Sequence, residues 1–197
     1  NPLSRSYFKL LEMVYDHNLL DYKHNINTAH IAEGPGGFIE AVVNIRKRMN
    51  KYNDKIYGIT LRNIDKDIPG WKKANSFLKM NTNIQIIYGK DNTGNIYNLE
   101  NIIDFKNKIG IHKCELITAD GGFDYSIDFN QQEQLSYQLI FCEIVCALSV
   151  QKLNGTFICK FFDTYTPLTI KYLWILNVFS ESIIITKPLT SRPANSE

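Results

Sequence analysis

Short apolar runs alternate with longer amphipathic stretches along the whole chain, and this alternation restricts the fold more than any other feature. The runs predict strands at Thr28–Ala32, Lys55–Thr60, Asn83–Tyr88, Cys114–Ala119, Thr156–Phe162 and Ser182–Thr186. The stretches predict helices at Tyr7–Tyr15, Phe38–Met49, Trp71–Met80, Asn98–Lys108, Gln131–Lys152 and Pro167–Phe179. This order indicates an α/β fold, with a mostly parallel, twisted sheet and helices on both faces.

Two boundary signals matter for the later argument. Asn154-Gly155 is typical of a helix end, so we expect it to stop the helix that begins at Gln131. The stretch from Lys90 to Asn98 has the most loop-like composition in the chain. Ligands of parallel sheets bind beyond the carboxyl ends of the strands, where several notable segments of this chain lie.

A glycine-rich turn, Glu33-Gly34-Pro35-Gly36-Gly37-Phe38, joins the first predicted strand to the helix that follows it. Glycine lets the backbone approach a ligand closely. The N–H groups at the start of a helix favour an anionic group such as a carboxylate or a phosphate. We therefore expect this turn to bind a ligand. Pro35 argues against a dinucleotide turn of the GxGxxG kind.

The composition is that of an ordinary globular domain. The 197 residues are 44% hydrophobic and 21% charged, and the net charge of +2 neither requires nor excludes nucleic acid. The apolar runs are too short to span a bilayer, and no signal peptide is visible. The four cysteines lie in apolar settings without a CxxC pair, which favours buried free thiols in a reducing compartment.

Two further segments follow or flank strand ends. Thr118-Ala119-Asp120-Gly121-Gly122 closes the fourth predicted strand, and the segment from Lys187 to Glu197 follows the sixth. Lys160 lies within an apolar strand, which is unusual for a lysine and points to a functional role. Taken singly, Asp120 would be a turn residue and Lys9 a solvated helix lysine.

Four segments together resemble the FtsJ-like (RrmJ-like) ribose 2′-O-methyltransferases, especially the eukaryotic and large-DNA-virus branch that methylates mRNA caps. They are Ser4–Glu12, Glu33–Phe38, Asp120–Gly122, and Phe157–Lys160 with Lys187–Glu197. Glycine turns are common, but four matches in the same order are specific, and they cover nearly the whole chain. The resemblance implies a Rossmann-like methyltransferase fold, with residues 1–197 as a single S-adenosylmethionine-dependent domain.

The resemblance also implies that Lys9, Asp120, Lys160 and Glu197 form the family's Lys-Asp-Lys-Glu catalytic tetrad. Methyl transfer from S-adenosylmethionine to a ribose hydroxyl leaves S-adenosylhomocysteine and requires no metal. Because the pKa of the hydroxyl lies far above neutrality, the site must align the reactants and stabilise a developing alkoxide. Lys160 could act as a base if a nearby cation such as Lys9 lowers its pKa, or it could remain charged and stabilise the oxygen. The sequence leaves both roles open.

By the same resemblance, the methyl donor contacts Glu33, Gly34, Pro35, Gly36, Gly37, Phe38, Asn63, Asp91 and Asp120. Asn63, or Asp65 in its place, would hold the ribose hydroxyls, where the family has an acidic residue. Asp91 would accept the adenine amino group.

The RNA would contact Arg5, Ser191, Arg192, Asn195 and Ser196. Trp71 or Tyr165 could stack on a cap guanine, although packing in the core is the favoured interpretation of Trp71.

The chain departs from the family at its end. The family has one more strand, inserted antiparallel, after the last glutamate, whereas this chain stops at Glu197. The chain also begins at Asn1-Pro2 without a methionine. We therefore expect a fragment of a longer protein, with other domains or subunits of a capping apparatus as partners beside the RNA.

The expected function is ribose 2′-O-methylation of the first transcribed nucleotide of capped mRNA. Methylation of ribosomal or transfer RNA, a catalytically silent RNA-binding or protein-binding module, and a nucleotide-dependent oxidoreductase remain alternatives. The expected location is intracellular: the nucleus for a cellular enzyme, and the host cytoplasm (a virus factory) or the virion for a viral one. The heavy use of Ile, Asn and Lys is compatible with a large cytoplasmic virus.

Overall fold

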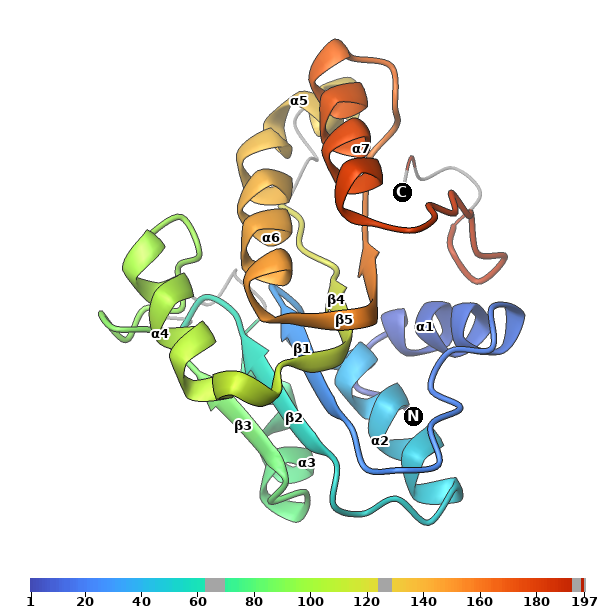
Figure 1. Ribbon diagram of the computed structural model, residues 1–197, viewed down its shortest axis with the longest axis vertical. Coiled ribbons are helices and arrows are strands. Elements are labelled where there is room, and N and C mark those ends of the chain that lie inside the picture. Colours follow the sequence, from blue (N-terminus) through green and yellow to red (C-terminus); the bar gives the residue numbers. More distant parts are fainter. Residues whose placement is uncertain (63–69, 124–128, 193–195, 197) are drawn as a thin grey trace.

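A parallel five-stranded sheet in the order β3-β2-β1-β4-β5 forms the centre of the computed structural model (Figure 1). Its strands are β1 (Asn27–Ile31), β2 (Lys55–Ile59), β3 (Ile84–Ile87), β4 (Cys114–Ala119) and β5 (Gln151–Cys159). The structure describes residues 1–62, 70–123, 129–192 and 196. The predicted contacts of Asn63, Asp65, Asn195 and Glu197 lie outside the described residues. All neighbouring strands pair in parallel, so the predicted α/β fold is confirmed.

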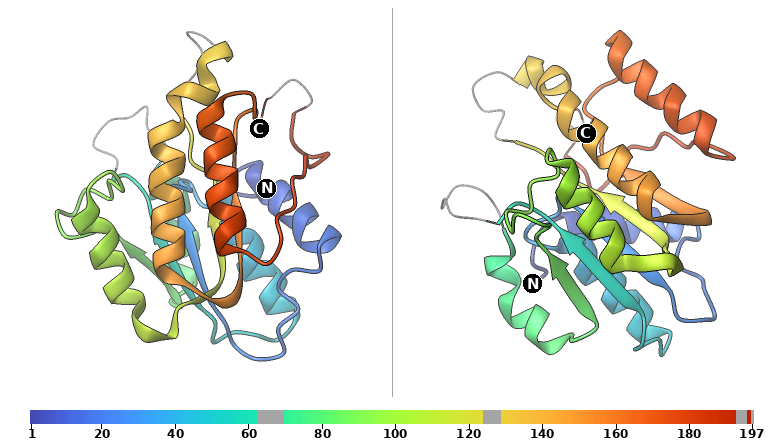
Figure 2. Two further views of the ribbon diagram at one scale, coloured as in Figure 1. Left: turned by 45° about the horizontal axis from the view of Figure 1, so that its top comes forward. Right: turned by 60° about the vertical axis from the view of Figure 1, so that its left-hand side comes forward.

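Helices cover both faces of the sheet (Figure 2). They are α1 (Ser6–Asp16), α2 (Gly37–Arg48), α3 (Asn75–Met80), α4 (Leu99–Ile109), α5 (Gln132–Leu135), α6 (Tyr137–Val150) and α7 (Pro167–Phe179). Successive strand residues point to opposite faces. Ile31 packs with Phe105 of α4 and Ala147 of α6, whereas Leu116 packs with Leu10 of α1 and Ile39 of α2. α7 lies against α6. Among the described residues, no helix is long and apolar enough to cross a membrane.

Local signals set several of the element boundaries. The Asn98 side chain accepts a hydrogen bond from the N–H of Glu100 at 3.1 Å and so caps α4. Pro167 occupies the first turn of α7, where a missing N–H costs no intrahelical bond. β4 and α7 begin and end at the predicted residues, and the stretch between Lys90 and Asn98 is a loop as predicted.

The single helix predicted from Gln131 to Lys152 is wrong. This part of the chain forms two helices, α5 and α6, instead of one. The hydroxyl of Ser136, which lies between them, donates to the carbonyl of Gln132 at 2.7 Å. α6 ends at Val150 because the next residue, Gln151, already pairs with Cys114 of β4.

The Asn154-Gly155 pair lies in an irregularity of β5 rather than at a helix end. Between the pairs Cys114↔Gln151 and Leu116↔Thr156, the β5 side contains extra residues, as in a β-bulge. A Cβ on Gly155 would lie 3.0 Å from the Cys114 carbonyl oxygen, so the close approach of the two strands requires glycine. β5 therefore begins before the predicted Thr156 and ends at Cys159 rather than at Phe162.

The sixth strand, predicted at Ser182–Thr186, is also wrong. This segment has no regular secondary structure, and the side chains of Ile184 and Ile185 are 66% and 73% exposed. A strand requires a neighbour with which to exchange backbone hydrogen bonds. Within the described residues, no strand pairs with this segment, and β5 is the edge of the sheet.

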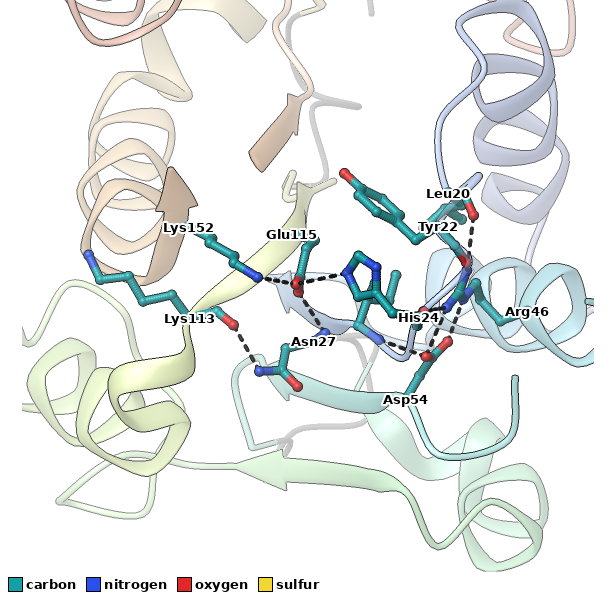
Figure 3. A network of polar contacts seen from close by, with 10 residues as sticks. Leu20, Tyr22, His24, Asn27, Arg46, Asp54, Lys113, Glu115 and Lys152 are labelled. Atoms are coloured by element: carbon teal, nitrogen blue, oxygen red, sulfur yellow. Dashed lines mark hydrogen bonds and ion pairs between the residues drawn. The ribbon is translucent and has the colours of Figure 1, made fainter. Parts of the chain in front are cut away.

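A buried ion pair anchors α2 at the end of the sheet where the strands begin (Figure 3). The Arg46 guanidinium donates to both carboxylate oxygens of Asp54 at 2.5 and 3.0 Å. It also donates to carbonyl oxygens of the segment between α1 and β1, those of Leu20, Tyr22 and His24. Asp54 in turn accepts the N–H of Ile26 at 2.8 Å. One guanidinium thus ties α2 to this segment and to the start of β2.

Trp71 belongs to the core, as favoured from the sequence. It is 5% exposed, and its ring lies against the glycine turn and β2. A Cβ added to Gly36 or Gly58 would come within 3.0 or 3.1 Å of the ring. Trp71 is therefore a packing residue, and Tyr165, which is 86% exposed, remains the candidate for stacking.

Candidate active site at the carboxyl ends of the strands

The order of strands along the sheet reverses between β1 and β4, and the candidate site lies at the carboxyl ends of these strands. Ile31 pairs with Ala119, so the glycine turn after β1 lies beside Asp120. Ala119 also pairs with Cys159 of β5, and the N–H of Lys160 donates to the Ala119 carbonyl at 2.9 Å. The register of three parallel strands thereby places Asp120 and Lys160 next to each other.

Helix α1 brings Lys9 to the same place. Leu10 and Val14 of α1 are buried in the same cluster as residues of α2 and of the sheet, which fixes the helix against them. The ammonium groups of Lys9 and Lys160 each lie 3.3 Å from the same Asp120 oxygen, Oδ1. Lys160 also donates to the Asp120 carbonyl at 3.1 Å. Three of the four predicted tetrad residues are therefore brought together.

The three side chains are largely shielded from solvent. Lys9, Asp120 and Lys160 have side-chain exposures of 14%, 14% and 16%. Limited exposure strengthens charge interactions relative to those in water. The Lys160 ammonium lies 5.0 Å from the centre of the Phe162 ring. Two ammonium groups that share one carboxylate favour negative charge on an oxygen bound beside them. Among the described residues, no group of three His, Cys, Asp or Glu side chains is arranged to hold a metal.

The glycine turn is shaped by close contacts. Gly36 has a φ of +100°, a conformation that favours glycine, and it immediately precedes α2. A Cβ on Gly37 would lie 2.2 Å from the Ser4 hydroxyl oxygen, so the segment before α1 lies directly against the turn. In the first turn of a helix the N–H groups lack intrahelical partners, and this turn follows Ile31, which pairs with Ala119 beside Asp120. This geometry suits an anionic group of a ligand.

The Glu33 carboxyl points into the protein rather than toward this region. Its oxygens contact His30 Nδ1 at 3.1 Å and the Thr118 hydroxyl, and the residue is 5% exposed. Burial raises the pKa of Glu33 above its ordinary value, against the opposing effect of His30. A contact between Glu33 and a ligand would therefore come from its backbone.

Asp91 organises its own loop. Its Oδ1 accepts from the N–H and hydroxyl of Thr93 and from the Asn101 amide, and its Oδ2 accepts from the Asn98 amide at 2.8 Å. Hydrogen bonds from the Thr93 hydroxyl and N–H are the main reason that the pKa of Asp91 lies well below its usual value. Because a carboxylate offers about four acceptor positions, two on each oxygen, Oδ2 is the oxygen with room for the predicted adenine amino group.

The segment 187–192 is held against α1. The Glu12 carboxylate accepts the N–H groups of Leu189 and Thr190 at 2.5 and 2.9 Å, and the Thr190 hydroxyl at 2.7 Å. Glu12 lies one helical turn after Lys9, so this clamp places the segment beside the lysine. The hydrogen bond from the Thr190 hydroxyl is the main cause of the lowered pKa of Glu12.

The predicted RNA-contacting residues differ in exposure. Arg5 and Arg192 are exposed, whereas Ser191 is 5% exposed and its N–H donates to the Pro188 carbonyl at 3.0 Å. The Ser196 hydroxyl donates to the Gln132 side chain at 2.7 Å, and its carbonyl accepts the N–H of Asp163 at 3.0 Å. Ser196 therefore lies near the segment that follows Lys160.

Comparison with known proteins identifies the family. The family model described as FtsJ-like methyltransferase matches residues 2–197, which include all the segments that form the site. The chain belongs to the FtsJ-like methyltransferase family. The resemblance recognised in the sequence is thereby confirmed. Membership of the FtsJ-like family implies a methyl donor of the S-adenosylmethionine type.

Several curated relatives carry the name cap-specific mRNA (nucleoside-2′-O-)-methyltransferase 1. The proteins from Mus musculus and Homo sapiens are each 37% identical over 180 residues, which cover 86% of this chain and 20% of each relative. The Dictyostelium discoideum protein is 35% identical over 185 residues, covering 85% of this chain and 24% of the relative. The chain thus spans about a fifth of the length of the mammalian relatives that it matches.

The fold has a counterpart among solved structures. A Plasmodium falciparum protein described as a ribosomal RNA methyltransferase superposes with a TM-score of 0.65 at 21% sequence identity. The alignment covers 95% of this chain and 92% of the other. At this identity the likeness supports the Rossmann-like methyltransferase fold and says nothing of the substrate.

Three polar residues of the site were missed in the sequence: Glu12, His30 and Glu143. Glu143 was detectable in principle, because it is the only charged residue of the mainly apolar helix α6. Glu12 carries no such signal, since its partners Leu189 and Thr190 are distant in the sequence, and His30 contacts the distant Thr118 as well as the nearby Glu33.

Buried acids make the stability of the fold depend on pH. Glu143 is 1% exposed, and burial, together with the Asp120 and Glu33 carboxylates, raises its pKa to about 8. An acid whose pKa is higher in the folded protein than in the unfolded chain keeps its proton longer when folded. The contribution of such an acid to the free energy of unfolding is therefore fully present at low pH, and it is lost as the pH rises through the raised pKa.

Raising the pH from 6 to 9 should lower the free energy of unfolding by about 3 kcal/mol through Glu143, since one pKa unit corresponds to about 1.4 kcal/mol. Glu143→Gln has no proton to lose and should show a smaller decline over the same range. Chemical denaturation of both proteins at both pH values measures this difference. Parallel pH dependences in the two proteins would contradict the prediction.

Proposed function

We propose that this chain transfers a methyl group from S-adenosylmethionine to the ribose 2′-hydroxyl of the first transcribed nucleotide of capped mRNA. The main support for the proposal is that the ammonium groups of Lys9 and Lys160 each lie 3.3 Å from the same oxygen of Asp120, beside the glycine turn. The names of the curated relatives support the cap as the substrate.

The glycine turn and Asp120 have the features that S-adenosylmethionine requires. Its carboxylate would lie against the N–H groups at the start of α2, in the backbone of Glu33 to Phe38. Its sulfonium would lie near the Asp120 carboxylate, which favours a cation. Asp91 would accept the adenine amino group through Oδ2, and Asn63 would hold the ribose hydroxyls. When bound, the donor supplies a methyl group on an electrophilic sulfur.

The ribose hydroxyl is a weak nucleophile, and residues of the protein would activate it. Lys160, held by the Asp120 carbonyl and carboxylate, would contact the ribose oxygen and either take its proton or stabilise its developing charge. Lys9 would keep positive charge beside Lys160, which favours loss of a proton from that lysine. Asp120 fixes both ammonium groups, and Glu197 would complete the tetrad.

The RNA would enter between α1 and the segment that follows Lys160. Arg5 and Arg192 are exposed and suited to phosphate contacts, and the exposed ring of Tyr165 is suited to stacking on a base. Asn195, Ser191 and Ser196 would shape the acceptor site, Ser191 from its buried position. The proposed location depends on the source: the nucleus for a cellular enzyme, and the virus factories of the host cytoplasm or the virion for a viral one.

Glu12→Ala should raise the KM for RNA about tenfold, because it removes hydrogen bonds worth about 1 kcal/mol each from the clamp on residues 187–192. The Kd of the methyl donor should be unchanged, since the clamp lies on the RNA side. Steady-state kinetics and calorimetry measure the two constants. Asp16→Ala, on the exposed end of the same helix, is the matched control. An unchanged KM in Glu12→Ala would show that the clamp has no role in RNA binding.

Capped and uncapped transcripts of the same sequence, offered side by side, test the substrate. We expect methyl transfer to the capped transcript and little to the uncapped one. Equal transfer to both would favour the ribosomal or transfer RNA alternative. Binding of donor and RNA without transfer would favour a silent binding module.

A further inference from the structure

A buried carboxyl lies directly beneath the turn that carries Asp120. Glu143 of α6 is 1% exposed, and its Oε1 accepts the N–H of Gly121 at 3.1 Å. The thiol sulfur of Cys159 lies 3.9 Å from Oε2. Gly121 directly follows Asp120, and Cys159 directly precedes Lys160. One carboxyl therefore touches the neighbours of two tetrad residues.

The glycines of the turn leave space for this arrangement. A Cβ on Gly121 would lie 2.3 Å from Glu143 Oε1 and 3.0 Å from the Ala32 side chain. A Cβ on Gly122 would lie 3.2 Å from the Lys160 ammonium. The turn is thus in close contact with the carboxyl on one side and with the lysine on the other. A shift of the turn would change the distances from Asp120 to both lysines.

An acid at this position is costly for packing. The rest of α6 is uncharged, and its neighbours Ile140, Ile144 and Ala147 are buried. A buried carboxyl is tolerated when it is hydrogen-bonded or neutral. The titratable groups that interact with Glu143 are Lys160, which directly follows β5, Asp120 in the turn after β4, Glu33 in the turn after β1, and the thiols of Cys142, Cys146 and Cys159. Every charged group among them belongs to the candidate site.

We propose that Glu143 is a positioning residue, whose carboxyl holds the Gly121 amide and thereby sets the place of Asp120 between Lys9 and Lys160. The proposal builds on the proposed function, because the geometry that Glu143 holds is that of the tetrad. The role differs from simple packing, since a hydrogen-bond acceptor is required and a side chain of similar size is not sufficient.

Two variants separate these roles. Glu143→Gln keeps a side-chain oxygen that can accept from Gly121, whereas Glu143→Leu keeps the approximate volume without an acceptor. We expect Glu143→Leu to lower kcat about ten- to hundredfold, since small misplacements of catalytic groups cost about this much. We expect Glu143→Gln to stay within about threefold of the parent kcat. Glu115→Gln, a buried acid at the opposite end of β4, is the matched control and should not change kcat.

The pH dependence of the rate distinguishes the positioning role from simple packing, because a change in packing alone would not shift the apparent pKa of the rate. In the parent protein, ionisation of Glu143 places a negative charge near Lys160, which favours the ammonium form of that lysine. In Glu143→Gln this charge is absent, so the apparent pKa that governs the rate at alkaline pH should fall. This direction holds whether Lys160 acts as a base or as a charged stabiliser.

Hydrogen exchange of the Gly121 amide tests the same contact without turnover. The amide should be protected in the parent protein and in Glu143→Gln, and should exchange at least tenfold faster in Glu143→Leu, consistent with loss of about 1.4 kcal/mol. An unchanged Gly121 exchange rate in Glu143→Leu would overturn the inference, as would equal losses of kcat in both variants. An inactive parent with the expected exchange pattern would refute the proposed function and leave the positioning contact established.

Discussion

Lys160→Ala is expected to lower methyl transfer by about a thousandfold or more while the Kd of the methyl donor stays within a factor of about two. The reason is that, in the proposed function, Lys160 contacts the ribose oxygen, whereas the glycine turn and Asp120 hold the donor. Lys160 also forms two contacts with Asp120, at 3.1 Å to its carbonyl and at 3.3 Å to its carboxylate. Asp120 keeps its contact with Lys9 when the Lys160 ammonium is removed, so we expect a larger effect on methyl transfer than on donor binding.

Single-turnover assays and calorimetric titration with S-adenosylhomocysteine measure the two effects separately. Lys171→Ala, an exposed lysine on α7, is the control and should behave as the parent protein. Lys9→Ala should be impaired less than Lys160→Ala, because in the proposed function Lys9 acts through its effect on Lys160. Full turnover in Lys160→Ala would refute the assignment of the site.

The second large effect concerns stability. Arg46→Met is expected to lower the free energy of unfolding by about 4 kcal/mol, the loss typical of removing one partner of a buried ion pair. Arg46 and Asp54 are each 1% exposed in their side chains. The substitution leaves the Asp54 carboxylate buried without its cation and removes donors from three carbonyl oxygens. This is a large share of the 5–15 kcal/mol that stabilises a typical domain.

Equilibrium denaturation in urea measures this loss. Arg48→Met, an exposed position on the same helix, should change the stability by at most about 0.5 kcal/mol. Adding Asp54→Asn to Arg46→Met should recover part of the loss, because no uncompensated charge is then buried. An Arg46→Met protein as stable as the Arg48→Met control would show that the pair contributes nothing to the fold.

Much of the fold could be predicted because local signals determined it. β4 is a short, mainly apolar segment and α7 begins at a proline, and both have the predicted bounds. Asp120 and Lys160 converge because the ends of parallel strands meet at one edge of the sheet, and Lys9 joins them from α1, as the family resemblance implied.

The errors arose where tertiary context decides. Periodicity describes one strand and not its partner, so the segment Ser182–Thr186 looked like a strand although no described strand pairs with it. Asn154-Gly155 has the composition of a helix end, yet the pairing of Gln151 with β4 stops the helix earlier. The contacts of Glu12 and Glu143 depend on segments distant in the chain, which composition and spacing do not reveal.

The most direct test of the account is mass spectrometry of nucleosides from a short capped transcript, incubated with the protein and S-adenosylmethionine and then digested. The account predicts one added methyl group on the ribose of the first transcribed nucleotide, and its absence with Lys160→Ala. A methyl group on a base, or unmodified RNA under conditions where the protein binds the donor, would contradict the claim that Lys9, Asp120 and Lys160 serve a ribose oxygen.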